Sequence, residues 1–470
     1  MTASADISFR LDRIELLNFR CFAKCALDLD PKTTVFVAEN AQGKTALLDA
    51  IARALDVYVS AVAYNRHAHG FDREDIHRSR DEAGKIQPRL PARFIAQGFF
   101  NNSPIRWGVS LKGAGLRARN SRGAATQFYK AVREVVEPPA QGAAPTAPRS
   151  LPLTAFYGTG RLWSEHKLTK GKRTIASMTP GRMSAFADCL SSSSSFKTFT
   201  AWYGASMEAL KNPALKGQDG DQRPERLLAA VREAVRTVLA PTGWSEIDWE
   251  FSNGEHPALS YGRGQLVVEH ATRGRFPLPY LSDGVRNMIA LTADLAHRCV
   301  RLNPHLGEDA ARLTPGILLI DEVDMHLHPR WQQLIVGLLA KAFPAMQMIL
   351  TTHSPHVLST VFVDSIRVIR LREGEGIVEK PKYQTRGVES ADVLANIMGV
   401  DPVPQVEEAT WLHNYRALVQ AGDFRTEAAD QEWRRLVNHF GPEHPVLTEV
   451  EMLKRLYDFK RANNIQGGTV

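Results

Sequence analysis

The sequence has few cysteines and no long apolar run. The four cysteines, Cys21, Cys25, Cys189 and Cys299, lack the spacing of a metal site, and the first two are expected to be small buried residues. No segment approaches the roughly 18 apolar residues that a membrane-spanning helix requires, and the N-terminal MTASADISFRLDR has no apolar signal core. A cytoplasmic protein with reduced thiols and no membrane partner is therefore expected.

A sustained heptad repeat is also missing, which excludes a long coiled-coil arm. The chain has 470 residues, and a typical size of about 150 residues per domain predicts two or three units. The formal net charge of +7 at pH 7 would attract polyanions, although charge alone does not identify a partner. Nucleic acid is therefore among the partners that the composition permits.

The stretch 37–45, VAENAQGKT, lies between a strand expected at 33–37 and a helix expected at 46–55. This is the layout of a phosphate-binding loop, in which backbone N–H groups and the positive end of the following helix surround a polyphosphate. Lys44 would reach the outer phosphates, and the hydroxyl of Thr45 would hold Mg²⁺. Taken alone, the short Gly-Lys-Thr could also be an incidental turn, so the rest of the chain has to decide.

Residues 316–322, GILLIDE, place two carboxylates directly after a run of large apolar residues. A central parallel strand of an α/β protein presents acids in this way at its carboxyl edge. Asp321 would then hold Mg²⁺ together with Thr45, and Glu322 would polarise an attacking water molecule. Two acids in a solvated loop are the alternative, but the apolar strand before them favours a nucleotide site.

A second apolar strand, expected at 347–350, is followed by His353, which could contact a γ-phosphate at the same sheet edge. Ser282, Asp283 and Gly284 precede an apolar helix. The serine and glycine at such a helix start can donate to a phosphate, although Ser-Asp-Gly is also a common helix cap. The order of the four motifs, from the loop through LSDG and the acids to the histidine, favours the phosphate-binding interpretation.

The segment 56–152 is less regular and is expected to form an inserted lobe. It contains basic residues and hairpin-like runs at 92–100 and 105–111, and it ends in a Pro/Ala-rich linker. The basic residues are interpreted as a solvated face, with nucleic-acid contact as the alternative. A buried strand at 153–157 then leads to YGTGR, a glycine-flanked turn at 157–161 that could approach a ligand closely.

Together, AENAQGKT, YLSDG, LLIDEVDMHLHP and TTHSPHVLS resemble the motifs of ABC-type ATPase heads of the RecF, Rad50 and overcoming-lysogenization-defect lineage. They look most like those of stand-alone bacterial AAA ATPases, such as the ATPases of Septu antiphage systems. The resemblance covers residues 10–55 and 153–370. It implies an α/β fold, with a P-loop ATPase head built on a mixed or parallel core sheet, an inserted α+β lobe and a helical C-terminal region.

The resemblance also implies a homodimer or a higher even oligomer, in which ATP and Mg²⁺ lie between the loop of one subunit and the LSDG of the other. Arg20, on residue type alone a solvated strand-end arginine, would approach the phosphates. The turn at 157–161 would replace the Q-loop without supplying a glutamine, and Asp324 would lie at the dimer contact. The expected catalytic residues are Glu322 and His353, and the expected metal ligands are Thr45 and Asp321. The expected nucleotide-binding residues are Arg20, Asn40, Ala41, Gln42, Gly43, Lys44, Thr45, Ala46, Ser282, Asp283 and Gly284.

The chain departs from the family pattern at three positions. Ala38 and Ala41 replace glycines of the loop, and Asp283 stands where transporter-type signatures carry glycine. An alanine with positive φ costs roughly 1–2 kcal/mol more than a glycine. Slow turnover or weak nucleotide binding is therefore expected.

After His353 the sequence lacks the pattern of relatives that carry their own nuclease, which is a strand-end glutamate and then Asp-x-Asp after another apolar strand. Residues 391–464 instead predict amphipathic helices, whose apolar faces would cover either the protein's own head or a partner. The expected domains are 1–55 and 153–385 for the head, 56–152 for the insertion, and 386–470 for a helical partner or dimer region.

Two functions fit these motifs. The first is an ATPase that dimerises on ATP and regulates or scaffolds a separate HNH-type nuclease in antiphage defence. The second is a RecF-like DNA-repair or recombination ATPase that acts on DNA. A transporter ATPase is disfavoured because the inserted lobe and its linker are not expected there. A neighbouring or co-purifying nuclease would favour the first function over the second.

Overall fold

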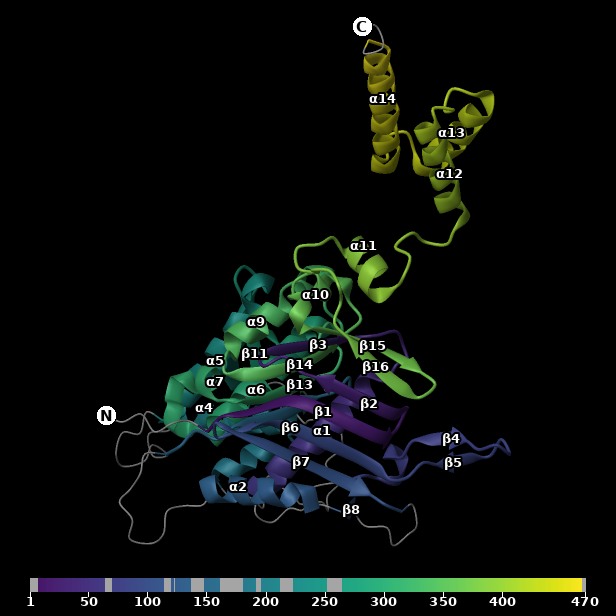
Figure 1. The fold of residues 1–470 in the computed structure, drawn as a ribbon. Helices are drawn as coiled ribbons and strands as arrows, with labels where there is room; N and C mark the ends of the chain where they lie inside the picture. The colour runs from purple at the N-terminus through teal and green to yellow at the C-terminus, as the bar shows by residue number, and fades with distance from the viewer. Residues whose placement is uncertain are drawn as a thin grey trace, which may run out of the picture. The chain divides into compact units, whose positions relative to one another are not determined.

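The computed structural model describes residues 7–63, 70–113, 120–121, 123–136, 148–160, 181–191, 196–211, 223–251 and 264–466. The chain divides into two compact units, Met1–Val393 and Leu394–Val470. In Figure 1 the first unit contains the strands and most of the helices, whereas the described residues of the second form helices and the loops between them. The four-part domain organisation expected from the sequence stays a prediction.

A mixed 11-stranded sheet forms the centre of the first unit, with the order β8-β7-β6-β1-β2-β16-β15-β3-β14-β13-β9 (Figure 1). Its strands are β1 Phe9–Phe19, β2 Phe22–Asp28, β3 Thr33–Val37, β6 Ala92–Phe100, β7 Ser103–Leu111, β8 Asn120–Ser121, β9 Leu153–Tyr157, β13 Gly316–Ile320, β14 Met346–Thr352, β15 Ile366–Arg372 and β16 Glu375–Glu379. Strands β6 to β8, from the predicted insertion, thus extend the same sheet. The predicted α/β class with a mixed core sheet is confirmed.

The parallel part of the sheet consists of β9, β13, β14, β3 and β15. Every residue of β9, β13 and β14 is buried, as expected for parallel strands with both faces covered. In this register Ile320 lies opposite both Tyr157 and Leu350, and Thr352 lies opposite Val37. The carboxyl ends of four strands therefore share one edge, and the loops that follow them meet there.

The two N-terminal strands, β1 and β2, form an antiparallel hairpin that turns at Arg20 and Cys21. Arg20 has a φ of 49°, in the left-handed region that such a tight turn requires. Cys25 is buried and Cys21 is partly buried, and all four cysteines have free thiols.

Helices cover the large sheet, and none that the structure describes is long and apolar enough to cross a bilayer. The nearly fully buried α1 begins directly after the phosphate-binding loop and extends beyond its expected end at residue 55. The helices of the first unit are α1 Lys44–Val62, α2 Thr126–Val136, α4 Phe196–Lys211, α5 Arg223–Leu239, α6 Asp283–Leu302, α7 Ala310–Leu313, α8 Pro329–Gln332, α9 Ile335–Ala342, α10 Pro355–Leu358 and α11 Ser390–Val393.

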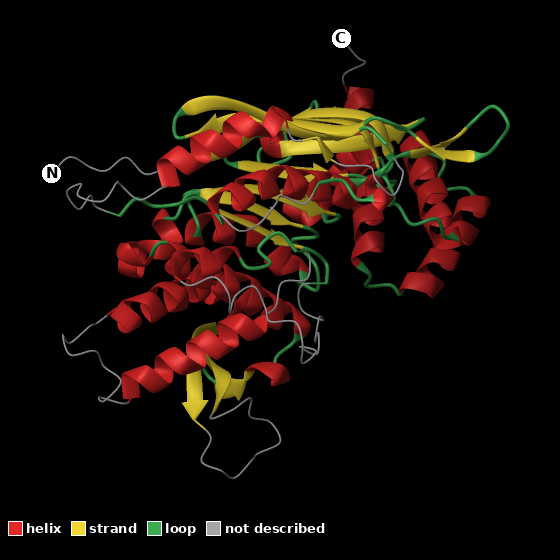
Figure 2. Cartoon of the chain, turned by 90° about the horizontal axis from the view of Figure 1, so that it is seen from below, coloured by secondary structure: helices red, strands yellow, loops and turns green. Residues whose placement is uncertain are grey.

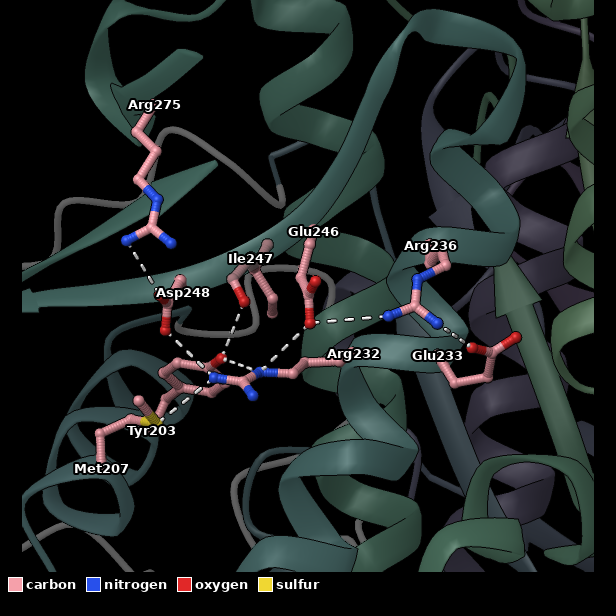
Figure 3. Close-up of polar contacts among 9 residues, drawn as sticks. All are labelled: Tyr203, Met207, Arg232, Glu233, Arg236, Glu246, Ile247, Asp248 and Arg275. Atoms are coloured by element: carbon pink, nitrogen blue, oxygen red, sulfur yellow. Dashed lines mark hydrogen bonds and ion pairs between the residues drawn. The ribbon is translucent and has the colours of Figure 1, made fainter. Parts of the chain in front are cut away.

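A small antiparallel sheet, of β10 Trp244–Phe251, β11 Gly264–His270 and β12 Gly274–Pro277, packs against α4 and α5. Figure 2 shows small strands beside helices and away from the large sheet. Arg232 of α5 joins this sheet to α4, because its guanidinium donates to the Tyr203 hydroxyl at 2.9 Å and to Asp248 at 3.1 Å (Figure 3). The aromatic side chains of Phe199 and Tyr203 on α4 are buried.

A buried polar triad joins the sheet edge to α6. The Tyr157 hydroxyl donates to Asp294 at 2.8 Å, and the Arg298 guanidinium donates to the same carboxylate at 2.8 Å. Arg298 also donates to the carbonyl oxygens of Ala185 and Ala187. The Arg298 side chain is itself buried, and an unpaired charge there would be costly. The triad therefore fixes the rotation of α6 relative to β9.

The second unit contains α12 Glu407–Ala421, α13 Glu427–Phe440 and α14 Pro445–Gln466. The apolar faces expected on these helices pack largely against one another, around a core that includes Tyr415, Leu436 and Val450. Three apolar residues of α14 remain outside this core, with exposed fractions of 69% for Met452, 49% for Leu456 and 64% for Phe459. Their spacing of four and three residues places them on one face of the helix.

We predict that Asp294→Ala destabilises the first unit by about 3 kcal/mol, because it leaves the Arg298 guanidinium buried without its carboxylate. Chemical denaturation followed by tryptophan fluorescence would measure the change. Asp309→Ala is the matched control, because it removes an exposed partner of Arg312 and should cost less than about 1 kcal/mol. Equal loss of stability in both variants would contradict the role assigned to the buried pair.

Candidate nucleotide site

The predicted phosphate-binding loop follows β3 and ends at the start of α1. Its lysine, Lys44, is folded into the loop, where Nζ donates to the carbonyl oxygens of Ala38 at 2.8 Å and of Glu39 at 3.0 Å. Burial lowers the pKa of Lys44, and the carboxylates of Asp321 and Glu322 oppose this shift. The ammonium thus lies close enough to both acids to interact with them electrostatically.

Two residues of the loop have a left-handed backbone, Ala41 with a φ of 62° and Gly43 with a φ of 91°. Gly43 has no room for a side chain, because a Cβ would lie 2.4 Å from the Phe22 ring and 2.7 Å from the Cys21 sulfur. Ala41 is exposed, but its methyl group makes the positive φ unfavourable. Ala38 is not among the residues of the described chain with positive φ, so only one of the two alanines in the loop carries backbone strain.

The other loop residues have different surroundings. Asn40 is exposed, and Ala46 is buried in the first turn of α1. The Gln42 side-chain oxygen accepts a hydrogen bond from the backbone N–H of Leu371 at 2.6 Å, which ties the loop to β15. These contacts place Gln42 as a support of the loop, and its predicted contact with nucleotide stays a prediction.

Asp321 is the polar centre of the site, with an exposed fraction of 2%. Its two carboxylate oxygens accept from different hydroxyls, of Thr45 at 2.9 Å and of Thr351 at 2.6 Å. The Thr351 hydroxyl also accepts from the backbone N–H of Glu322 at 2.7 Å. The sequence analysis did not single out Thr351; its only signal was the polar pair Thr-Thr at the end of an apolar strand. A threonine hydroxyl beside a carboxylate is the kind of oxygen pair that Mg²⁺ accepts.

Glu322 and His353 follow β13 and β14 at the same sheet edge. Glu322 has a φ of 48°, in the left-handed region of backbone conformation. Burial and the nearby Lys44 ammonium lower the pKa of His353, whereas Glu322 and other carboxylates oppose the shift. The imidazole is therefore uncharged at neutral pH and can donate or accept a hydrogen bond there. The structure thus brings together Lys44, Thr45, Asp321, Glu322 and His353.

Arg20 lies at the turn before β2, and carboxylates hold its guanidinium. Nε lies 3.0 Å from Asp75, and Nη1 forms a second ion pair with Asp49 of α1. Asp75 is buried, whereas burial raises the pKa of Asp49 and Arg20 opposes that shift. The predicted contact of Arg20 with phosphates stays a prediction, and these two acids would compete for the same guanidinium.

The LSDG residues lie at the start of α6 and contact a different segment. Ser282 occupies the N-cap position, yet its exposed side chain makes no capping hydrogen bond. A Cβ at Gly284 would lie 2.5 Å from the carbonyl oxygen of His326. The side chain of Asn287 donates to the carbonyl oxygen of Met325 at 3.2 Å. This close approach packs the helix start on residues that directly follow the two acids.

Two further predicted residues have separate positions. Asp324, expected at a dimer contact, accepts from the Thr352 hydroxyl at 2.5 Å, which joins the segment after β13 to the end of β14. Asp283 forms an ion pair with Arg286 on the first turn of α6. Tyr157 uses its hydroxyl in the buried triad, whereas Arg161 of the same turn lies outside the described residues.

Two family models match the chain. One is described as "AAA domain, putative AbiEii toxin, Type IV TA system" and matches residues 206–359, and the other is described as "AAA domain" and matches residues 13–133. A retron Ec83 probable ATPase from Escherichia coli is 26% identical over 96% of this chain and 88% of its own length. A Septu protein PtuA from Bacillus thuringiensis is 27% identical over 29% of this chain and 35% of its own length. RecF replication and repair proteins also match, over shorter stretches.

Among solved structures, an SMC head domain from Thermotoga maritima superimposes with a TM-score of 0.43 at 14% identity. It covers 80% of this chain and 100% of its own.

We predict that Ala41→Gly tightens ATP binding by at most about tenfold, or about 1.4 kcal/mol, because glycine takes the positive φ of the loop without strain. Isothermal titration calorimetry would measure the dissociation constant. Ala38→Gly is the matched control, because it removes the same methyl group where no strain exists, and it should not tighten binding. An affinity of Ala41→Gly for ATP that is unchanged or weaker than that of the parent would contradict the prediction.

Proposed function

We propose that this chain, whose sequence contains AAA ATPase domains related to those of retron and Septu ATPases, binds ATP with Mg²⁺ and hydrolyses it slowly. The observation that carries the proposal is the pair of hydrogen bonds from Thr45 and Thr351 to Asp321. These bonds join the phosphate-binding loop to the strand that carries the acids. Without that connection, the loop and the acids would be separate features of the sequence.

Each residue of the site has a proposed task. The backbone N–H groups of the loop and the start of α1 would hold the phosphates, and Lys44 would leave the carbonyl oxygens of Ala38 and Glu39 to bind the outer ones. Thr45 and Asp321 would hold Mg²⁺, which neutralises phosphate charge when bound. Glu322 would orient a water molecule and accept its proton, while uncharged His353 would donate to the γ-phosphate.

We further propose that ATP pairs two copies of the chain, as a homodimer or as part of a higher even oligomer. The support is the start of α6, where the Ser282 side chain is exposed and makes no capping hydrogen bond. A serine in that position can donate to a phosphate held by another copy. The segment after Glu322, which packs on Gly284, would then link hydrolysis in one site to the contact with the second copy.

Glu322→Gln is predicted to retain ATP binding but to lose at least about a hundredfold in hydrolysis, because the amide keeps the shape and lacks the charge that accepts a proton. A phosphate-release assay would measure turnover, and size-exclusion chromatography with light scattering should reveal dimers that persist with ATP. Glu379→Gln on β16 makes the same change at an exposed glutamate and should leave turnover unchanged. Parental turnover in Glu322→Gln would exclude Glu322 as the base.

The wider function that we propose is regulation of a separate HNH-type nuclease in antiphage defence. The sequence supports it, since the nuclease pattern is missing after His353 and Asp-x-Asp occurs only at 28–30 and 219–221. The exposed stripe of Met452, Leu456 and Phe459 supports a partner surface in the second unit. The alternative is a RecF-like ATPase that acts in DNA repair, which the shared head motifs also support.

Removal of the second unit is predicted to spare ATP hydrolysis and to abolish binding of the nuclease. The cut belongs after Val393 and not near Thr385, because the backbone N–H of Gly387 bonds to Ser359 and the Ser390 hydroxyl lies 2.8 Å from His356. Co-expression with an HNH nuclease encoded beside the gene, followed by affinity purification, would measure binding.

The triple variant Met452→Ser, Leu456→Ser and Phe459→Ser tests the stripe without removing the unit and should lose the nuclease as well. Val400→Ser with Val403→Ser changes exposed apolar residues elsewhere in this unit and serves as control. A truncated protein that still bound the nuclease at full stoichiometry would contradict the docking proposal. Cleavage of DNA by the purified chain alone, with Mg²⁺ or Mn²⁺, would contradict the proposal that the nuclease is a separate protein.

A further inference from the structure

A two-stranded antiparallel ribbon, of β4 Arg78–Arg80 and β5 Ile86–Pro88, projects from the first unit (Figure 1). Arg78 pairs with Pro88, and Arg80 pairs with Ile86, so that these four residues share one face of the ribbon. All four are exposed, and Ile86 has an exposed fraction of 61%. The face thus combines two guanidinium groups with an apolar side chain that the first unit does not bury.

The end of the ribbon is held in a fixed turn. The Asp81 carboxylate accepts from the backbone N–H groups of Ala83 at 3.1 Å and of Lys85 at 2.8 Å. On the other face, Arg89 donates to the Ser79 hydroxyl and to the carbonyl oxygen of Arg80. An isolated hairpin is only marginally stable in water, so these contacts keep an otherwise unsupported element in shape.

The charges of the ribbon are unequal. Arg78, Arg80 and Lys85 are exposed cations, and Glu82 is an exposed acid at the turn. Asp81 is engaged with the backbone of the turn. The ribbon therefore presents mainly positive charge on a narrow, preformed element. The major groove of B-form DNA admits a two-stranded β-ribbon, and arginine pairs well with the phosphates that line it.

We propose that the β4–β5 ribbon enters the major groove of duplex DNA, where Arg78 and Arg80 bind the DNA phosphates. Binding of DNA to the ribbon is coupled to binding of ATP at the nucleotide site through Arg20. Ile86 then contacts the groove as the apolar residue opposite Arg80. The DNA contact stands by itself, whereas the coupling rests on the proposed ATP site.

The coupling follows from the contacts at the root of the ribbon. The backbone N–H of His77 donates to the carbonyl oxygen of Asn18 at 3.0 Å, and its ring nitrogen lies 2.6 Å from the carbonyl oxygen of Arg20. The N–H of Arg20 donates to the carbonyl oxygen of Asp75 at 2.7 Å, in addition to their ion pair. The ribbon and the Arg20 turn therefore form one bonded unit.

The Arg20 turn and the root of the ribbon also contact the elements of the nucleotide site. Arg20 pairs with Asp49, and Arg53 pairs with Asp75 at 3.2 Å, so that two residues of α1 bind the root. Phe22, at the start of β2, packs against Gly43 of the loop. A displacement of the ribbon by DNA acts on the loop through these contacts, and by thermodynamic reciprocity ATP then changes the affinity for DNA by the same factor.

Fluorescence anisotropy of a labelled 30-base-pair duplex, titrated with the full chain at several salt concentrations, tests the DNA contact. Arg78→Ala with Arg80→Ala should weaken binding at least about tenfold and reduce the slope of log affinity against log salt by about 2, for two lost phosphate contacts. Arg312→Ala with Lys341→Ala removes two exposed cations from α7 and α9, and it should leave affinity unchanged.

Three results would overturn the DNA contact: no binding of the duplex by the parent chain, equal binding by the ribbon variant, or equal binding of duplex RNA. The last would mean that the contact does not depend on a wide major groove, because that of A-form RNA is deep and narrow. None of these measurements requires ATP, so a failure of the proposed ATPase activity would not affect them.

Asp75→Asn and Asp49→Asn test the coupling, since each weakens one ion pair of Arg20 and keeps the size of the side chain. Both should bind the duplex like the parent without nucleotide and lose the change in affinity that ATP causes in the parent. Lys44→Ala, which lacks the lysine proposed to bind the phosphates, serves as the control for a chain that does not bind ATP. If ATP does not change the parent's affinity for the duplex, or changes it equally in the two variants, the coupling is wrong and the DNA contact remains.

Discussion

The hydrogen bonds of Asp321 are the interaction on which the site depends. Its carboxylate accepts from Thr45 at the start of α1 and from Thr351 at the end of β14, so that three separate segments meet at one buried group. A buried carboxylate needs such partners, because an unpaired charge in the interior would be strongly destabilising. The packing of α1 on the parallel strands and the arrangement of the site are therefore enforced by the same contacts.

A second set of contacts ties α6 to this centre, at the start of the helix and in its second half. At the start, Gly284 allows the helix backbone to approach the carbonyl oxygen of His326, a few residues after Glu322. Further along, Asp294 and Arg298 hold the helix against Tyr157 of β9, whose carbonyl oxygen in turn accepts from the backbone N–H of Asp321. The LSDG residues are thus connected to the acids through packing and hydrogen bonds.

Arg20 connects the nucleotide site to a region that sequence motifs do not describe. Its guanidinium lies between Asp49 of α1 and the buried Asp75, and its backbone carries hydrogen bonds to the root of the β4–β5 ribbon. These two ion pairs join α1 to the segment that carries the root of the ribbon.

The sequence by itself determined the central strands and the motifs of the site. The strands β3 and β9 have the predicted bounds, and the bounds of β13 and β14 differ from the predicted ones by at most two residues. These strands could be predicted because buried parallel strands require continuous apolar runs, which are visible in the local sequence. Ala41, which stands where the family pattern carries glycine, has a positive φ, whereas Ala38 does not. Only the tertiary structure decided that Thr351 supports Asp321 and that Arg20 is held by two acids. It also decided that β6 to β8 extend the main sheet. The exposure of Met452, Leu456 and Phe459 outside the core of their unit was likewise visible only in the structure. These features are pairings between residues far apart in the chain, and local periodicity contains no information on which distant partner a side chain meets.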